Sequence, residues 1–197
     1  MKKIPLTQSS YCLHNTSFGE IAILWSVYQE QMKILRVLLS NSDYSAGQWL
    51  KISFPHSISS SCAEIDVVAD LMLAFLTGDD IGFSLDIACL DLCSNFQQQV
   101  LRAEHGIPRG YVSTYQRIAR YLGMNRGARA VGTALASNPF PIIIPCHRAI
   151  RSDRTLGGYQ GGLEMKRALL EMEGISFDDN GQVATKNFFY SKGNIKC

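Results

Sequence analysis

The feature that most constrains the fold of this 197-residue chain is a change of hydrophobic pattern near residues 88–95. Before it, two β-rich runs, 21–28 and 33–40, are separated by a short polar link, which predicts a hairpin. After it, apolar residues recur at helical spacing in short segments joined by Gly and Pro. We therefore expect an α/β domain over residues 1–90, a mostly α-helical domain over 91–178 and a loose tail over 179–197.

The first domain carries further weak signals. Residues 47–53 form a weaker strand candidate, and residues 83–87 alternate like a strand. Residues 64–76 predict a helix that ends at Thr77-Gly78, with Ile65, Val68, Leu71, Met72 and Phe75 on one face. No catalytic constellation is visible in this half, which indicates a structural role.

The second domain predicts short helices over 96–104, 113–122 and 128–137, and a last one over 163–173 that ends at Gly174. Ser113 and Gln116 fit a capping box at the start of the second helix, and Gly123 ends it. The second and third helices are joined by a tight link, so the pair is a helix-turn-helix candidate.

The third of these helices consists largely of small residues, namely Ala128, Ala130, Gly132, Ala134, Ala136 and Ser137. Such a helix can pack closely against neighbouring helices. It can also fit the narrow minor groove of DNA, which excludes bulky side chains. Composition alone leaves both interpretations open.

Charge is distributed unevenly. Residues 1–95 carry five basic and ten acidic side chains, whereas residues 96–159 carry nine arginines, no lysine and only two acids. An arginine-rich block beside an acidic one is typical of a domain that binds a polyanion. An ordinary solvated surface remains the alternative.

The six cysteines are scattered, at positions 12, 62, 89, 93, 146 and 197, with no CxxC pair. Without a secretory signal, a disulfide framework is not expected. Cys89 and Cys93 lack a nearby His, so buried thiols are favoured over a zinc site. No run reaches the ~20 apolar residues of a membrane span. We expect an intracellular protein, cytoplasmic or at the nucleoid in a prokaryote and nuclear in a eukaryote.

A short apolar run, Pro141–Pro145, precedes Cys146-His147-Arg148. The flanking prolines predict a buried, rigid, strand-like segment. Positive charge or a His base beside Cys146 would lower its thiol pKa and favour the nucleophilic thiolate. A His base needs a third group to orient it, and Glu173 is the candidate. The alternative is a buried thiol beside an incidental imidazole.

A series of motifs runs in order, without a gap, through residues 95–175. They are FQQQV (96–100), IPRG (107–110), STYQRIA (113–119), ARAVG (128–132), NPFPIIIPCHR (138–148), GGYQGG (157–162) and LLEMEG (169–174). The series resembles the O6-alkylguanine-DNA alkyltransferases, whose active-site signature is IPCHR.

The resemblance implies an RNase H-like α/β domain followed by a domain with a winged-helix-like helix-turn-helix. It implies DNA repair by direct reversal: the chain flips O6-alkylguanine out of duplex DNA and transfers the alkyl group irreversibly to its own cysteine, once per molecule. O4-alkylthymine is a second substrate that the sequence leaves open. The implied partner is double-stranded DNA, bound in the minor groove without sequence preference. A monomer is expected, and no metal or organic cofactor is required.

The resemblance also carries catalytic roles over, residue by residue. It makes Cys146 the nucleophile and alkyl acceptor. His147 takes the thiol proton through a water, and Glu173 orients His147. Asn138 supports the turn beneath the site.

Other residues are implied to bind DNA or the substrate base. Arg129 enters the duplex in place of the displaced guanine. Tyr115 helps to rotate the nucleotide and donates to the leaving base, and Tyr159 walls the pocket. The remaining expected contacts are Ser113, Thr114, Ala128, Gly132, Arg148 and Gln160.

The chain departs from the family pattern at two positions. Ala149 and Gln160 stand where many members carry Val and Ser, respectively. Gln160 borders the pocket, which puts the tolerance of bulky alkyl groups in doubt.

Three rival functions fit the sequence less well. Alkyltransferase-like binding proteins replace the active-site cysteine, which this chain retains. A cysteine hydrolase needs an oxyanion site, and a purely structural DNA binder needs no thiol after residues 141–145.

Overall fold

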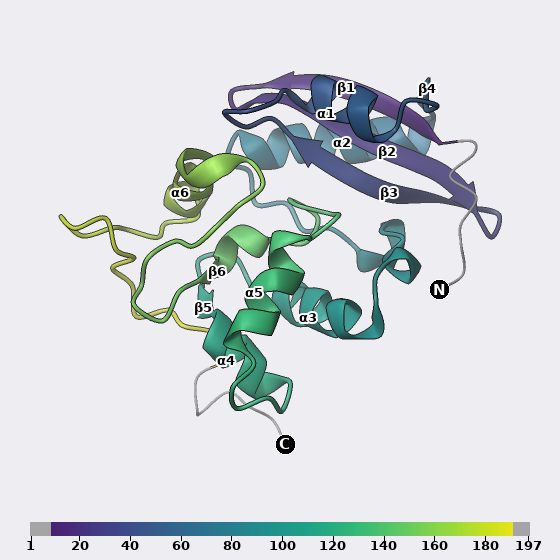
Figure 1. Ribbon diagram of the computed structural model, residues 1–197. Coiled ribbons are helices and arrows are strands. Elements are labelled where there is room, and N and C mark those ends of the chain that lie inside the picture. Colours follow the sequence, from purple (N-terminus) through teal and green to yellow (C-terminus); the bar gives the residue numbers. More distant parts are fainter. Residues whose placement is uncertain (1–8, 191–197) are drawn as a thin grey trace. The chain divides into compact units, whose positions relative to one another are not determined.

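The computed structural model describes residues 9–190; Cys197 and both ends of the chain lie outside this range (Figure 1). Contacts divide the chain into two compact units. The first comprises Met1–Ser94 with Pro139–Ile143, and the second Asn95–Asn138 with Ile144–Cys197. The boundary expected near residue 90 lies close to the first break, but the packing of residues 139–143 with the first unit was not predicted from the sequence.

A four-stranded mixed sheet forms the first unit, in the order β3-β2-β1-β4. β1 (Ser10–Thr16), β2 (Gly19–Tyr28) and β3 (Gln31–Leu39) are antiparallel neighbours, and β4 (Ile58–Ser59) pairs in parallel with β1. The predicted hairpin is confirmed as β2–β3. Gln29 and Glu30, both with positive φ, make its two-residue turn. The strand β1 was not predicted.

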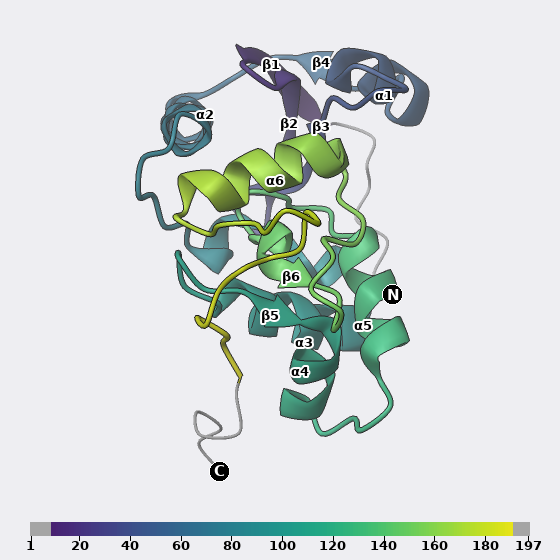
Figure 2. The ribbon, with the colours of Figure 1, turned by 90° about the vertical axis from the view of Figure 1, so that its left-hand side faces the viewer.

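Helices lie on both sides of this sheet, α1 (Ala46–Ser53) on one and α2 (Ala63–Leu76) on the other (Figures 1 and 2). Ala46 and Leu50 of α1 pack against Ala22 and Leu24 of β2 in one apolar cluster. The predicted helix over 64–76 is confirmed with its end at Thr77, although Leu71 is 37% exposed.

Two strand predictions in this unit are wrong. Residues 47–53 belong to α1, whose Ser45 and Gln48 form a complete capping box. Residues 85–87 form a 3₁₀ turn that Ser84 caps. The apolar residues of these short segments favoured strands, but local caps determined the backbone in both places.

Helices dominate the second unit: α3 (Asn95–His105), α4 (Tyr115–Tyr121), α5 (Ala128–Ala136) and α6 (Gly162–Met172). α3, α4 and α5 pack on one another. A short parallel pair, β5 (Ser113–Thr114) and β6 (Ala149–Ile150), joins the start of α4 to the segment after Cys146. The four predicted helices are confirmed, with Gly123 and Gly174 in the left-handed conformation after α4 and α6.

The capping box predicted at Ser113 and Gln116 is wrong. Thr114 is the cap of α4, and its hydroxyl accepts from the backbone N–H of Arg117. Ser113 lies in β5, where its hydroxyl donates to the carbonyl of Phe189. The tertiary pairing of β5 therefore moves the start of the helix by one residue.

The segment Pro141–Pro145 is buried, as predicted, but it is not strand-like. Residues 142 and 143 form a turn in which Ile142 has a φ of 75°, a rare conformation for a β-branched residue. The neighbouring Pro139 accepts a backbone hydrogen bond from Val37 of β3 at 2.8 Å.

The expectation of a loose tail after residue 178 is wrong for the part that the structure describes. Val183 is buried in an apolar cluster with Val112, Ile150, Leu170 and Ile175. Tyr190 stacks on Tyr121 with ring centroids 4.0 Å apart and donates to the carbonyl of Ala103. Within residues 9–190, no helix is long and apolar enough to cross a membrane.

Candidate active site

Cys146 opens a 3₁₀ turn, Cys146–Arg148, that leads directly into β6. Asn138, which follows α5, donates its side-chain amide both to the Cys146 sulfur and to the carbonyl of Ile144, each at 3.2 Å. These two bonds tie Asn138 to the residues on either side of Pro145. The thiol is thereby held in place, with Cys146 8% exposed.

Burial controls the protonation of this thiol. Burial is the main reason why the pKa of Cys146 is raised to about 11; the Asn138 hydrogen bond and Lys166 lower this pKa, and the Glu104 carboxyl adds to the rise. The lowered pKa expected from nearby positive charge is therefore wrong for the resting protein. Cys146 is therefore a thiol at neutral pH.

His147, the residue after Cys146, forms a buried hydrogen-bonded pair with Glu173. His147 is fully buried, and its Nε2 lies 2.8 Å from Oε1 of Glu173, the residue that ends α6. Burial lowers the pKa of His147 more than Glu173 raises it, so the imidazole is neutral. Because the carboxylate holds the proton on Nε2, the other ring nitrogen, Nδ1, is the basic one.

Arg148 completes this buried group. Its guanidinium donates to both oxygens of Glu173, at 2.8 to 3.2 Å, and to the carbonyl of Ile107 at 2.6 Å. Burial raises the pKa of Glu173, but the bonds and charges of His147 and Arg148 outweigh it and bring the pKa to about 2. Arg148, expected among the contacts to DNA or substrate, is thus engaged inside the protein.

Two tyrosines flank the site. The ring of Tyr159 stands edge-on to His147 with centroids 6.2 Å apart, and its hydroxyl is buried without a hydrogen-bond partner among the described residues. Burial, followed by the charges of Glu104 and Cys146, raises the pKa of Tyr115 to about 12, so its hydroxyl remains a donor. Gly157 lies against this hydroxyl: a Cβ there would stand 2.5 Å from it.

Lys166 was not among the site residues predicted from the sequence. This residue of α6 is fully buried and donates to the carbonyls of Ala149 at 2.6 Å, Leu156 at 2.7 Å and Gly158 at 3.3 Å. It ties the loop that carries Tyr159 to β6. Its place beside Met165 on the apolar face of α6 was the available signal.

Glu104 was missed as well. It lies on the buried face of α3 with Val100 and Leu101, and neither carboxyl oxygen has a hydrogen-bond partner in the described chain. Burial raises its pKa to about 8, against the opposing charges of Lys166 and Arg148. An acid at helical spacing within an apolar stripe was the signal.

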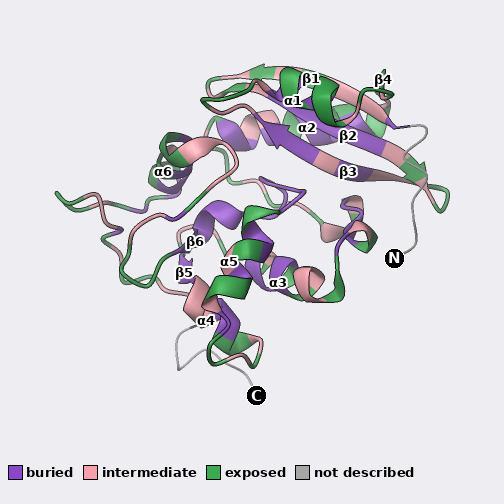
Figure 3. Cartoon of the chain, viewed as in Figure 1, coloured by how far each residue is buried: buried purple, intermediate pink, exposed green. Residues whose placement is uncertain are grey.

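The helix α5 presents the expected DNA-binding residues on its open side. Arg129 is exposed, Ala128 and Gly132 are half-buried, and a Cβ added at Gly132 meets nothing within 4 Å. Val131, Ala134 and Leu135 form the packed side, as the mixed burial of α5 in Figure 3 shows. Packing within the protein therefore does not explain the small residues on the outer side.

The remaining residues expected to contact DNA or the substrate base differ in burial and in their hydrogen bonds. Ser113 and Thr114 are buried, and their hydroxyls take part in the internal bonds of β5 and α4. Gln160 is half-buried beside Tyr159. Cys89 and Cys93 are buried, and the described residues contain no cluster of three or more potential metal ligands.

The chain is similar in sequence to known proteins. The family model for the DNA-binding domain of 6-O-methylguanine DNA methyltransferase matches residues 95–175. A methylated-DNA–protein-cysteine methyltransferase of Methanothermobacter thermautotrophicus is 42% identical over 120 residues, which cover 61% of this chain and 67% of that protein. One from Haemophilus influenzae is 47% identical over 97 residues, 49% of this chain and 54% of that protein.

Solved structures are also similar. The Mycobacterium tuberculosis O6-methylguanine methyltransferase has a TM-score of 0.68 at 29% identity, covering 84% of this chain and 92% of that one. The M. tuberculosis structure in complex with DNA has a TM-score of 0.66 at 29% identity, covering 83% and 92%. By its match to the archaeal relative, the chain belongs to the family of methylated-DNA–protein-cysteine methyltransferases.

Proposed function

We propose that this chain repairs DNA by moving an alkyl group from O6 of guanine to the sulfur of Cys146, once per molecule. One observation carries the assignment. The thiol of Cys146 is held by Asn138 and is followed directly by a neutral His147, which the ionised Glu173 orients. A positioned thiol with an oriented base is the arrangement that nucleophilic catalysis by cysteine requires.

These groups account for the proton and the electron pair that move in the reaction. The thiol proton passes to Nδ1 of His147, through a water. The sulfur attacks the alkyl carbon as the bond from that carbon to O6 breaks, and the electron pair leaves with guanine. Tyr115, still protonated at neutral pH, donates to the departing base. The product thioether cannot re-form the thiolate easily, so turnover stops.

Duplex DNA reaches this site only if the target nucleotide leaves the stack, at a cost of about a few kcal/mol. We assign that step to α5. Its outer side of small residues suits the minor groove, and the exposed Arg129 fills the space of the extruded base. Tyr159 and the loop 157–162 then enclose the flipped base.

The finer architecture is part of the same proposal. We assign the first unit to the RNase H-like class and α4 with α5 to a winged-helix-like helix-turn-helix. The mixed sheet with helices on both sides, and the close packing of α4 on α5, support these assignments. The site of action would be the compartment that holds the chromosome.

Intact-mass analysis tests the function. After incubation with duplex DNA that contains O6-methylguanine, we expect the mass to rise by one methylene unit, on the peptide that contains Cys146. Cys146→Ala should show no gain while it still binds duplex. Cys62→Ala, which removes a half-buried thiol of the first unit, is the matched control and should react normally. A gain of mass in Cys146→Ala would refute the assignment, and binding without any gain in the wild type would identify a non-enzymatic binder.

A further inference from the structure

A pocket of about 540 Å³ lies in the second unit, apart from the residues assigned to alkyl transfer. It is lined by α4, by the turn after β6 and by residues 185–188 near the end of the described chain. We call it the basic pocket, because its charged side chains are Arg117, Arg120, Arg154 and Lys186. Hydroxyl groups, one amide and the ring of Phe188 make up the rest of the lining, which contains no acid.

Among the described residues, no acidic side chain neutralises the positive charge of the basic pocket. None of its four cations forms an ion pair with any residue between 9 and 190. Nη1 of Arg117 is buried and has no hydrogen-bond partner in that range. Asp153, the nearest acid in sequence to Arg154, accepts instead from the backbone N–H and hydroxyl of Thr155, at 3.0 and 2.7 Å. A concentration of like charge of this kind favours an anion.

The basic pocket is also well organised. The guanidinium groups of Arg117 and Arg154 lie over the ring of Phe188, at 4.5 and 5.7 Å from its centroid. Backbone bonds of Val112 to Asn187, at 3.0 Å, and of Phe189 to Val112, at 2.8 Å, dock this segment beside the start of α4. Arg154 is held at a φ of 68°, an uncommon conformation for a residue other than glycine.

We propose that the basic pocket binds the sugar–phosphate backbone of the substrate duplex, as a second contact beside the extruded base. The inference rests on the proposed function and adds a DNA contact made partly by the chain after residue 178. Thr114, which lines the pocket, directly precedes Tyr115, the residue assigned to the flipped nucleotide. The pocket therefore adjoins the proposed DNA-binding surface.

Phosphate chemistry suits this set of side chains. Arginine presents a planar fork that matches phosphate oxygens, and hydroxyl and amide groups commonly complete phosphate contacts. Contacts of this type carry no sequence information, which suits a protein that must act on damage in any sequence. They also make affinity dependent on salt, because each neutralised phosphate releases counterions.

The test is the salt dependence of duplex binding by the full chain, measured by fluorescence anisotropy. For Arg154→Gln with Lys186→Gln, we expect the slope of log Kd against log salt to become shallower by about 1 to 2, and affinity at low salt to fall about tenfold or more. Alkyl transfer from free O6-benzylguanine should be unchanged, since the free base needs no phosphate contact. Arg154→Lys should retain most of the affinity.

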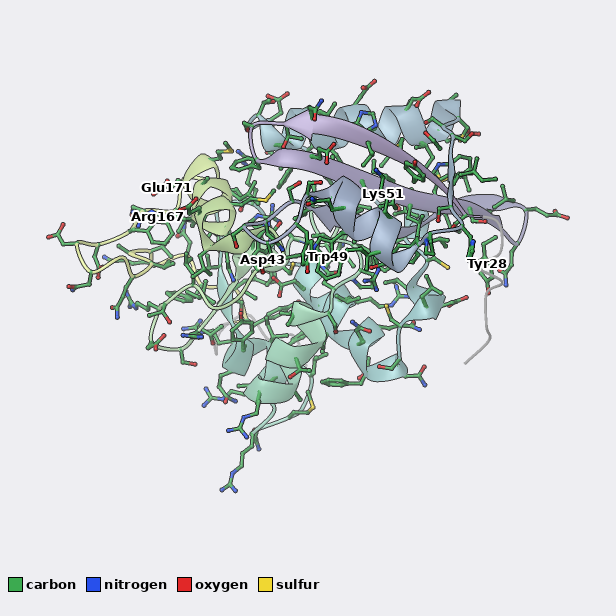
Figure 4. All side chains as sticks on the ribbon, turned by 45° about the horizontal axis from the view of Figure 1, so that its top comes forward. Tyr28, Asp43, Trp49, Lys51, Arg167 and Glu171 are labelled. Atoms are coloured by element: carbon green, nitrogen blue, oxygen red, sulfur yellow. The ribbon has the colours of Figure 1, made fainter. Side chains whose placement is uncertain are left out.

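Arg167→Gln is the matched control. Arg167 lies over Phe177 at 4.5 Å, as Arg117 does over Phe188, but it is paired with Glu171 on the outer side of α6 at 2.8 Å (Figure 4). This variant loses one positive charge, against two in the double variant, and should keep the wild-type slope. An unchanged slope in the double variant, or an equal change in Arg167→Gln, would overturn the inference. Failure of the wild type to acquire the alkyl group would instead overturn the proposed function.

Discussion

Two buried carboxyl groups of the second unit have opposite protonation states. Glu173 accepts hydrogen bonds from His147 and Arg148 and has a pKa of about 2, whereas Glu104 lacks such partners and has a pKa of about 8. Hydrogen bonds and opposite charges stabilise the first carboxylate, and burial destabilises the second. Glu173 is therefore a fixed negative charge next to His147, whereas Glu104 is a titrating group near Cys146.

Glu104→Gln should change how stability depends on pH. A carboxyl whose pKa rises from 4.5 to about 8 on folding binds more protons in the folded state between those values. Its stabilising contribution is complete below about pH 4.5 and is lost as the pH rises to about 8. Relative to the variant, the wild-type free energy of unfolding should fall between about pH 5 and pH 8, as measured by urea unfolding. Parallel curves for the two proteins would contradict the raised pKa.

Gly157→Ala should disturb Tyr115. Gly157 has a φ of 71°, and an added Cβ would stand 2.5 Å from the Tyr115 hydroxyl. We expect a loss of about 1–3 kcal/mol of stability, together with slower alkyl transfer, measured by thermal unfolding and by mass gain over time. Gly158→Ala is the control, because a Cβ there meets nothing within 4 Å. Equal behaviour of the two variants would contradict the close approach of Gly157 to Tyr115.

At the scale of elements, α5 has one packed side and one open side of small residues. Sequence composition could not choose between internal packing and a DNA groove, because both require small side chains. The structure separates them: Val131, Ala134 and Leu135 pack internally, whereas Ala130 and Ala136 are exposed. The small outer side is therefore free to approach a flat or narrow surface.

Substitutions of Gly132 test this side of α5. Gly132→Ala should raise the free energy of unfolding by about 0.5–1 kcal/mol, because glycine is a poor residue within a helix. It should leave duplex affinity nearly unchanged. Gly132→Leu should fold equally well but bind duplex at least several-fold more weakly, since the longer side chain obstructs the minor groove. Equal affinity of both variants, measured by anisotropy, would argue against entry of α5 into the groove.

The capping motifs show how far local sequence specified these elements. The same S-x-x-Q pattern occurs at Ser45–Gln48 and at Ser113–Gln116. The first forms a complete capping box and starts α1, where the analysis expected a strand. The second does not form, because Ser113 pairs in β5 and donates to Phe189. Long-range pairing, which no local pattern reveals, decided between them.

For the whole molecule, residues 179–190 matter more than their weak sequence pattern indicated. A chain that ends at residue 178 should unfold at a lower temperature, because it loses the burial of Val183 and the stacking of Tyr190 on Tyr121. Val183→Ala in the full chain should lower the free energy of unfolding by about 2 kcal/mol. Because this variant keeps the residues of the basic pocket, it separates the effect of lost packing from the effect of losing the pocket. An unchanged melting temperature in the shortened chain would contradict the packing of this segment.

The sequence by itself determined the hairpin β2–β3, the helices of the second unit and the motif around Cys146. Hydrophobic period, helix-ending glycines and contiguous motifs are local properties, so they can be read along the chain. Only the tertiary structure decided that Cys146 is a protonated thiol, that Arg148 serves Glu173, and that Glu104 and Lys166 lie buried nearby. It also brought the end of the described chain to α4 to form the basic pocket. Burial and charge pairing depend on which distant segments meet, and that information is absent from local patterns.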